Sequence, residues 1–460
     1  MSEPPTAEPA RPRRQLSLVD AVCIMVGVVI GAGIFETTPR IAELAGGPAM
    51  LIGLWLAGGL LALVGALCYA ELATTYPRNG GDYVYLSRAY GRGTGFIFAW
   101  TAFWIVRPGN IGAMALIFGR YAAELFPLEF GGHGRLAYAV AAVIVPTALN
   151  TAHISGGKWT QNVLTAIKVL GLFAVVVAGL SASVTVPPIG FGSPPRPETN
   201  LVVAMVLVLF TYGGWSETAY VAAEVRKPEV NLFRALMFGV AALTLMYVAF
   251  TAALIHALGY DGMRRAAAAP ALVVEHFFGD GRPMLAVLIC ISCLGSVHGM
   301  ILTGSRIFQV AGEDHRALRW LGEWNARAEV PARSLLVQGL VSVALLVIVG
   351  IHADAFERLV LFTGPVFFFF LLMTGLSLFI LRRRDRGIPR GYRVFAYPVT
   401  PLLLCASAAF MLYATTEYAL RYGGIEGLYA LGVLVTGLAF YFFFRGRPSA
   451  ARDVRQVPIE

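Results

Sequence analysis

Two glycines interrupt a long apolar segment near the start of the chain, in Val28-Val29-Ile30-Gly31-Ala32-Gly33-Ile34-Phe35. A later apolar segment is interrupted in the same way, in Phe210-Thr211-Tyr212-Gly213-Gly214-Trp215. A helix that crosses a bilayer must satisfy its own backbone hydrogen bonds, so an unwound turn at mid-depth is tolerated only where it lines a cavity or binds something. Transporters built from inverted repeats contain such discontinuous helices, whose free N–H and C=O groups face their ligands. The two glycine breaks therefore predict a ligand site near the middle of a membrane.

The composition is that of a membrane protein. Of the 460 residues, 57% are hydrophobic and only 14% are charged, and the mean hydropathy is +0.68. Soluble domains carry a much larger charged fraction. We expect an all-α polytopic protein with twelve transmembrane helices, because a span needs roughly 20 apolar residues. The predicted spans are 17–42, 49–74, 94–125, 136–152, 158–181, 200–222, 233–257, 284–310, 333–351, 357–381, 399–420 and 425–444.

The positions of the two breaks predict an inverted repeat. They fall in the first and sixth predicted spans, and an odd number of spans between equivalent helices turns the second copy upside down. We expect a LeuT-like arrangement of five plus five helices in which helices 1 and 6 are discontinuous. Repeat 1 covers about 17–181, repeat 2 about 200–381, and helices 11 and 12, about 399–444, are added outside the repeat. The alternative is that the glycines only allow close helix packing.

The polar parts of the chain predict its orientation. We expect residues 1–14 to form a disordered cytoplasmic tail, 15–445 a single transmembrane transporter domain, and 446–460 a second cytoplasmic tail. Most of the 36 Lys and Arg residues fall on the side of the two termini, which places both termini in the cytoplasm. The run Arg382-Arg383-Arg384 acts as an orientation signal and can also contact anionic lipid. Residues 257–283 read as an outside loop.

Other classes of function find little support. The net charge of +9 includes no basic stretch interleaved with exposed aromatic residues, so no nucleic-acid partner is expected. We find no G-x-S-x-G, H-E-x-x-H or clustered carboxylate pair, which disfavours a membrane enzyme, and no catalytic residue is assigned. Acidic or carbonyl rings typical of channels are also missing, although a channel is excluded less firmly. Cys290-x-x-Cys293 lies in an apolar helix without neighbouring His or carboxylate, so no disulfide, metal or cofactor is predicted.

Several motifs taken together resemble the amino acid permeases of the amino acid–polyamine–organocation (APC) superfamily, and most closely its L-type amino acid transporter (LAT) branch. The matching stretches are Ile30 to Phe35, Tyr69 to Leu72, Tyr76 to Tyr85, Arg107-Pro108, Gln161 to Lys168, Phe210 to Trp215, Glu224 to Asn231, Arg306, Tyr392-Arg393 and Tyr397-Pro398. The resemblance implies a sodium-independent transporter of neutral L-amino acids in the plasma membrane, here a bacterial inner membrane. It would work by alternating access, as an exchanger or, alternatively, as a proton-coupled symporter.

The resemblance also implies where an amino acid would bind. Its carboxylate would lie against the N–H groups of Ala32 and Gly33, within the unwound turn that Ile30 and Gly31 begin. Its ammonium would meet the carbonyls of Val29, Phe210 and Gly213. Phe210 matches a gate position, and Trp215 is a second gate candidate, although either ring could simply pack. Asn110 either faces the side-chain pocket or bonds a neighbouring helix. Many family members have Ser where this chain has Ala32, which removes one hydroxyl donor.

Lys168 is the most unusual charge in the predicted spans. It lies about 15 Å along the fifth span, at 1.5 Å per residue, which is too deep for easy snorkelling. An unpaired ammonium at that depth costs about 3 kcal/mol or more, so we expect it to be paired or to bind carbonyls of the broken first span. In the family, the lysine occupies the place of a sodium ion in sodium-coupled relatives. Its role is left open between structural support, proton coupling and substrate sensing.

Two further buried side chains need partners. Arg107 matches a family hallmark and reads as a structural tether, with Glu71 and Glu217 as candidate counter-charges. His298 is either a proton carrier or a packed residue. Animal LAT subunits join a single-span heavy chain through a cysteine after the third span. The loop Pro127 to Arg135 has none, so we expect no disulfide-linked partner and possibly a monomer, with the amino acid and the lipid bilayer as its partners.

Overall fold

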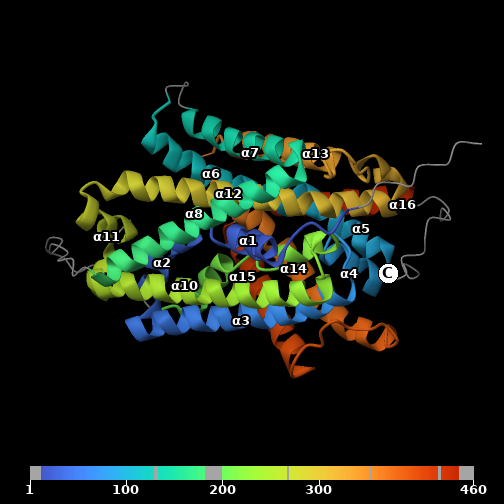
Figure 1. Cartoon of the computed structure of the whole chain (residues 1–460), viewed down its shortest axis with the longest axis horizontal. Helices are drawn as coiled ribbons and strands as arrows, with labels where there is room; N and C mark the ends of the chain where they lie inside the picture. Colours follow the sequence, from blue (N-terminus) through green and yellow to red (C-terminus); the bar gives the residue numbers. More distant parts are fainter. Residues whose placement is uncertain are drawn as a thin grey trace, which may run out of the picture.

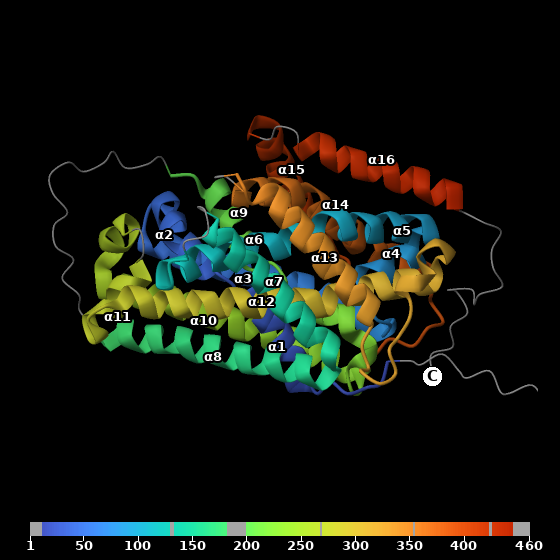
Figure 2. The same ribbon diagram turned by 90° about the horizontal axis from the view of Figure 1, so that it is seen from above.

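A computed structural model describes residues 12–128, 133–181, 199–266, 269–352, 355–422 and 426–444 (Figures 1 and 2). Its regular elements are helices, in agreement with the all-α prediction. They are α1 (Leu18–Val29), α2 (Gly33–Ala45), α3 (Pro48–Thr75), α4 (Asp82–Tyr90), α5 (Arg92–Thr101), η1 (Ala102–Val106), α6 (Arg107–Leu125), α7 (Gly134–Ala152), α8 (Ile154–Ser181), α9 (Leu201–Thr211), η2 (Glu217–Glu224), α10 (Pro228–Arg265), α11 (Ala269–Phe278), α12 (Gly281–Asp314), η3 (Arg316–Leu321), α13 (Ala332–Val349), α14 (Ala355–Arg384), α15 (Val399–Tyr422) and α16 (Glu426–Phe444).

The count of spans agrees with the sequence only in part. In the described part of the chain, nine helices are long and apolar enough to cross a membrane, or ten if α1 and α2 form one bent span. The predicted spans 200–222 and 425–444 correspond to α9 and α16, whose described apolar helices, Leu201–Thr211 and Tyr429–Phe444, are shorter. The predicted tails lie outside the described residues except for 12–14.

The first predicted span is broken where the sequence indicates. Ser17 caps α1 through its hydroxyl while Asp20 bonds back to the Ser17 N–H, so the helix starts from a complete capping box. It ends at Val29, and α2 begins at Gly33 with its axis turned by 49°. The discontinuity of helix 1 is therefore confirmed.

The second predicted break is a longer irregular stretch. Helix α9 ends at Thr211, the chain passes through turns, and it continues as the 3₁₀-helix η2 from Glu217. Gly214 has φ of +100°, a backbone conformation that L side chains rarely adopt. Glycine here is therefore required by the path of the chain and does not only allow close packing.

Two regions differ from expectation. The predicted outside loop 257–283 is largely helical, because α10 continues to Arg265 through a kink at Gly259 and α11 follows. The third predicted span is not a uniform α-helix either. Between α5 and α6 lies the π-helical segment η1, in which the N–H of Arg107 bonds to the carbonyl of Ala102. A π turn holds one residue more than an α turn and often occurs at functional positions.

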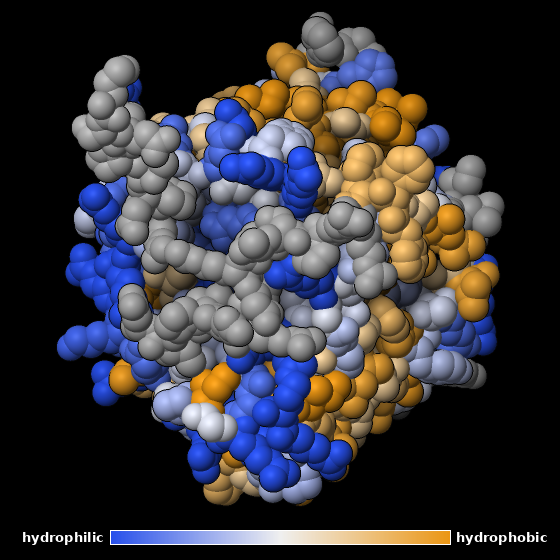
Figure 3. Space-filling view, turned by 90° about the vertical axis from the view of Figure 1, so that its right-hand side faces the viewer, coloured by the Kyte–Doolittle hydropathy of each residue, from blue (hydrophilic) through white to orange (hydrophobic). Residues whose placement is uncertain are grey.

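One end of the bundle is tightly closed. We call it the terminal-side end, and it holds Leu16, the loop 76–82 and Val225; Figure 3 looks onto it and shows hydrophilic residues gathered there. The N–H groups of Gln15 and Leu16 donate to the Glu224 carbonyl, and Arg226 donates back to Leu16. The Arg306 guanidinium forms a bidentate pair with the buried Glu224 carboxylate at 2.9 and 3.0 Å. The segment before α1 is thus bound to the segment after η2.

Candidate functional site

The two breaks lie against each other in the middle of the bundle. A Cβ atom at Gly214 would be 3.0 Å from Cγ1 of Val28, and one at Gly33 would be 3.2 Å from Cγ2 of Thr211. The hydroxyls of Thr37 and Thr211 are 3.0 Å apart, which joins α2 to α9. These close approaches need glycine, because a side chain would hold the two unwound segments apart.

The first break exposes backbone donors. Within the described residues, no hydrogen bond is formed by the N–H groups of Ala32, Gly33 and Ile34, whereas those of Phe35 and Glu36 both donate to the Ala32 carbonyl. The start of α2 also carries the positive end of the helix dipole. Three free donors at a helix N-terminus form a site for an anionic group such as a carboxylate.

The second break offers an acceptor. Nothing in the described part of the chain donates to the carbonyl of Gly213. The carbonyl of Phe210 accepts from the Gly213 N–H at 2.9 Å, and that of Val29 accepts from the Gly31 N–H at 2.8 Å. Gly213 therefore has the freest of the three carbonyls predicted to meet an ammonium group.

A tyrosine that the sequence did not single out links the breaks. The hydroxyl of Tyr247, on α10, lies 3.2 Å from the Val29 carbonyl and 3.5 Å from the Thr211 carbonyl. Its ring is fully buried against Trp55 and Tyr212, with centroids 5.4 and 5.1 Å away. A phenol has a single proton, so one donor is shared between the last carbonyls of both unwound helices.

Lys168 binds the carbonyls of the first break. Its Nζ lies 2.7 Å from the Gly27 carbonyl, 2.8 Å from that of Ile30 and 2.9 Å from that of Ser292 on α12. The three protons of the ammonium are thus matched by three acceptors, which is the contact predicted from its depth. A Cβ at Gly295 would come within 2.7 Å of Nζ, so this glycine makes room for the ammonium.

Further polar groups support the same carbonyls. Ser296, one turn beyond Ser292, places its hydroxyl 2.9 Å from the Val28 carbonyl. His298 is fully buried, and its Nδ1 lies 2.9 Å from Oε1 of Gln161, while Nε2 finds no partner among the described residues. His298 is therefore packed in a polar cluster beside the break. No sequence signal distinguishes Ser296 from other small residues in a membrane helix.

Arg107 is tied to the second break through a carboxylate. Its Nη1 lies 3.0 and 2.9 Å from the two oxygens of Glu217, the first residue of η2, and Thr303 donates to the same carboxylate. The guanidinium also lies over the ring of Tyr220, 4.5 Å from its centroid. The prediction of Glu217 as counter-charge is confirmed.

The prediction of Glu71 as counter-charge to Arg107 is wrong. Its carboxylate is fully buried near the end of α3, where it accepts hydrogen bonds from Arg382, from Arg390 and from the N–H of Val394. The segment after α14 folds back over α3 and supplies these donors. The positions of these residues in the sequence do not indicate this tertiary contact.

The remaining predicted site residues have distinct settings. Phe210, one residue before the end of α9, is 37% exposed. Trp215 packs edge-on against Tyr69, at a centroid distance of 4.9 Å. Asn110 is half-buried and makes no hydrogen bond within the described residues, which does not support its alternative role as a helix-to-helix bridge.

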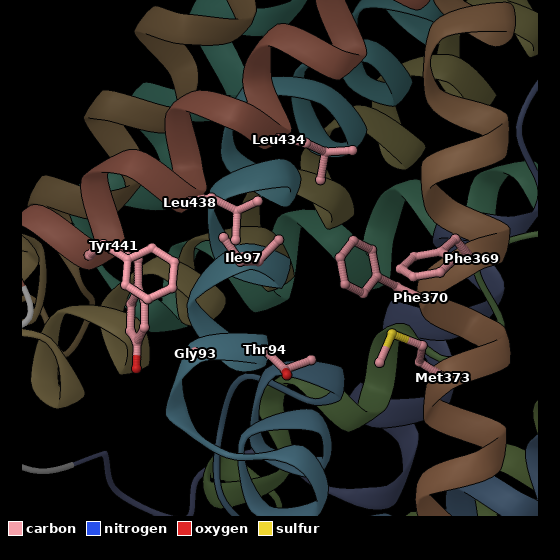
Figure 4. A pocket seen from close by; sticks show the side chains of 10 residues that line it. Gly93, Thr94, Ile97, Phe369, Phe370, Met373, Leu434, Leu438 and Tyr441 are labelled. Atoms are coloured by element: carbon pink, nitrogen blue, oxygen red, sulfur yellow. The ribbon is translucent and has the colours of Figure 1, made fainter.

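An apolar groove of about 370 Å³ lies elsewhere, between α5, α14 and α16 (Figure 4). Ile97, Phe370 and Leu438 are among the residues that line it, and no residue of either break contributes to it. The candidate site is accordingly defined by the free backbone groups of the two breaks.

Comparison with known proteins adds independent information. A family profile described as amino acid permease matches residues 16–435. The b(0,+)-type amino acid transporter 1 of Mus musculus is 26% identical over 94% of this chain and 88% of its own length. The large neutral amino acids transporter small subunit 2 of Oryctolagus cuniculus is 28% identical, over 96% and 83%. The serine/threonine exchanger SteT of Bacillus subtilis is 27% identical, over 95% and 98%.

Proposed function

Because the chain belongs to the amino acid permease family, whose members are transporters and not enzymes, we propose that it carries neutral L-amino acids across the plasma membrane without sodium. The observation that carries the proposal is the pairing of free donors with a free acceptor across the two breaks. The N–H groups of Ala32 and Gly33 suit a carboxylate, and the carbonyl of Gly213 suits an ammonium. A zwitterion supplies both charges.

The charges around the breaks favour a neutral side chain. Glu217 is bound by Arg107 within the bundle, and Glu36, near the start of α2, is bound by Arg120. A cationic substrate would need an unpaired carboxylate, and an anionic one an unpaired cation, since a buried charge without a partner is costly. Asn110 and Phe210 remain available for contact with the substrate side chain.

The setting of Lys168 supports transport without sodium. Its ammonium occupies the carbonyls of Gly27, Ile30 and Ser292, which are groups of the kind that coordinate a sodium ion. The Lys168 ammonium, which is part of the protein, thereby takes the place that a bound sodium ion would have. We accordingly propose a structural role for Lys168 at the first break.

The mechanism we propose is alternating access with both termini in the cytoplasm. The bonds that join Leu16 to Arg226 close the terminal-side end, whereas Phe210, just before the second break, keeps 37% of its surface exposed. This combination suits a state that opens away from the termini. Movement of the two broken helices, α3 and α10 against the other helices would open the opposite path. We propose that this happens within a twelve-helix inverted repeat that acts without a heavy chain.

We favour exchange, and proton-coupled uptake is the second candidate. In favour of the second, Lys168 has only carbonyl partners and no carboxylate within the described residues, so it could release a proton without leaving an unpaired anion. Uptake of labelled amino acids into proteoliposomes separates the two. Stimulation by internal substrate, without effect of sodium or of a pH gradient, supports exchange. Uptake into empty vesicles that follows the proton gradient supports symport, and failure to move any amino acid contradicts both.

A further inference from the structure

The last turn of α14 and the segment that joins it to α15 together contain six arginines that serve two different purposes. Three are bound by the protein: Arg382 and Arg390 bind the Glu71 carboxylate, and Arg384 donates to backbone carbonyls of α4. The segment is further held by Asp385, which accepts from Tyr76 at 2.8 Å and from Arg88 at 2.6 Å. These contacts fix the backbone firmly on α3 and α4.

The other three arginines face outward. Arg383, Arg386 and Arg393 are exposed, and none of them forms an ion pair or side-chain hydrogen bond within the part of the chain that the structure describes. Exposed cations in water need no partner, but these three lie on one short segment of fixed backbone. Their local positive potential is therefore not cancelled by the protein.

Apolar side chains follow directly in the sequence. Phe395 is 77% exposed and Tyr397 is 38% exposed, and Arg382 lies over the Tyr397 ring, 3.9 Å from its centroid. Helix α15 then begins at Val399 with Leu402 and Leu403 also exposed, 53% and 47%. Because α15 is long and apolar enough to cross the membrane, the residues just before it lie at the depth of the lipid headgroups.

We propose that residues 383–397 form a binding surface for the headgroups of anionic phospholipids, which we call the arginine surface. The three free guanidinium groups would bind phosphate, for which their geometry is well suited. Phe395 and the start of α15 would contact the acyl chains of the same lipids. A polar protein or nucleic acid would match the arginines but would leave the adjacent apolar side chains in water.

The surface is connected to a helix of the site. Glu71 of α3 receives Arg390 and the N–H of Val394, both within the same segment, and α3 also carries Trp55, whose ring packs on Tyr247. Anionic lipid on the arginine surface would stabilise the segment in its folded-back position and so hold the end of α3. This inference does not depend on which amino acid is transported.

The test uses the full chain with Tyr397→Trp as a fluorescent reporter, reconstituted with brominated phosphatidylglycerol or brominated phosphatidylcholine. The difference from the parent protein isolates quenching of the new tryptophan and gives the relative binding constant of the two lipids. Each basic residue near an anionic membrane surface adds a similar increment to the binding free energy. Three such residues together should favour the anionic lipid by roughly 100-fold at low salt. We expect R383Q/R386Q/R393Q to remove most of this preference, and added salt to weaken it.

A matched triple variant keeps the result specific. Arg135, Arg265 and Arg282 are exposed at the opposite end of the bundle and form no ion pair in the described chain, so R135Q/R265Q/R282Q changes net charge equally. A retained preference in this variant, together with its loss in the first, supports the proposal. Equal lipid preference before and after R383Q/R386Q/R393Q overturns it, as does an equal loss in both triples. Competition by free inorganic phosphate as strong as that by anionic vesicles also overturns it, and the single variant R393Q repeats the test if the triple fails to fold.

Discussion

The two breaks solve the same backbone problem in opposite ways. At the first, the freed carbonyls are bound by the Lys168 ammonium, and the N–H groups of Ala32 and Gly33 are left over. At the second, the chain turns through Gly214, a carboxylate on the following helix binds Arg107, and the Gly213 carbonyl is left over. A buried cation secures each break, but one cation binds backbone and the other binds a side chain.

The difference explains how the breaks become complementary. Lys168 binds the carbonyls of Gly27 and Ile30 at the first break, where the N–H groups of Ala32 and Gly33 remain free, and the second break presents the Gly213 carbonyl as an acceptor. Each backbone group left buried without a partner costs free energy until a ligand satisfies it. A zwitterion between the breaks therefore completes hydrogen bonding that the protein alone leaves incomplete.

The comparison is tested most severely by Lys168→Met, which removes three donors at once. Each of the three buried carbonyls would be left without a donor, at a cost of about 1–3 kcal/mol. Transport should therefore fall by roughly 100-fold or more, and the protein should unfold at a lower temperature. Lys158→Met is the control, because Lys158 lies on the same helix but forms only a loose, partly exposed ion pair with Asp20, at 3.7 Å. Similar transport by the two variants would show that the ammonium does not support the first break.

The second break should depend on its carboxylate instead. Glu217→Gln leaves Arg107 buried without a counter-charge, which should lower the free energy of unfolding by about 3–5 kcal/mol. Arg107→Met combined with Glu217→Met should recover part of this loss. Denaturant unfolding measures both. Glu323→Gln, in an exposed pair with Arg333, should cost no more than about 1 kcal/mol, and an equal loss there would contradict the argument.

The path of the second break can be tested at Gly214. A Cβ at this position meets Val28 and forces an L residue to positive φ, so Gly214→Ala should destabilise the protein by at least about 1–2 kcal/mol and reduce transport. Gly53 lies exposed within α3 with nothing within 4 Å of its Cβ position. Gly53→Ala should be neutral or slightly stabilising, and thermal unfolding compares the two. A neutral Gly214→Ala would mean that the turn is not constrained.

The smallest expected effect is that of the shared hydroxyl. Tyr247→Phe removes the one proton that serves both breaks, which should cost about 1 kcal/mol and raise KM about 5-fold with little change in folding. Tyr85→Phe is a matched control, since the Tyr85 hydroxyl is equally buried but has no hydrogen-bond partner among the described residues. An unchanged KM in Tyr247→Phe would show that the shared hydroxyl does not couple the two breaks.

Sequence reasoning located the breaks because glycine within an apolar run is a local signal. The same reasoning placed most helices, because apolar length alone defines a span. It could not choose between Glu71 and Glu217, since Glu217 is 110 residues from Arg107 and only packing brings them together. Tyr247 and Ser296 were also missed, because a hydroxyl in a uniformly apolar helix has no periodicity that reveals which side it faces.

The π-helical segment Ala102–Val106 holds one residue more than a regular turn at the point where α5 passes into α6. Because its hydrogen bond spans five residues instead of four, the wide turn absorbs the extra residue, and Arg107 points nearly where it would point in a regular helix one residue shorter. Deleting one residue there should therefore restore a regular helix and leave the ion pair of Arg107 with Glu217 in place. Homologues that keep the ion pair can accordingly differ in length by one residue at this position.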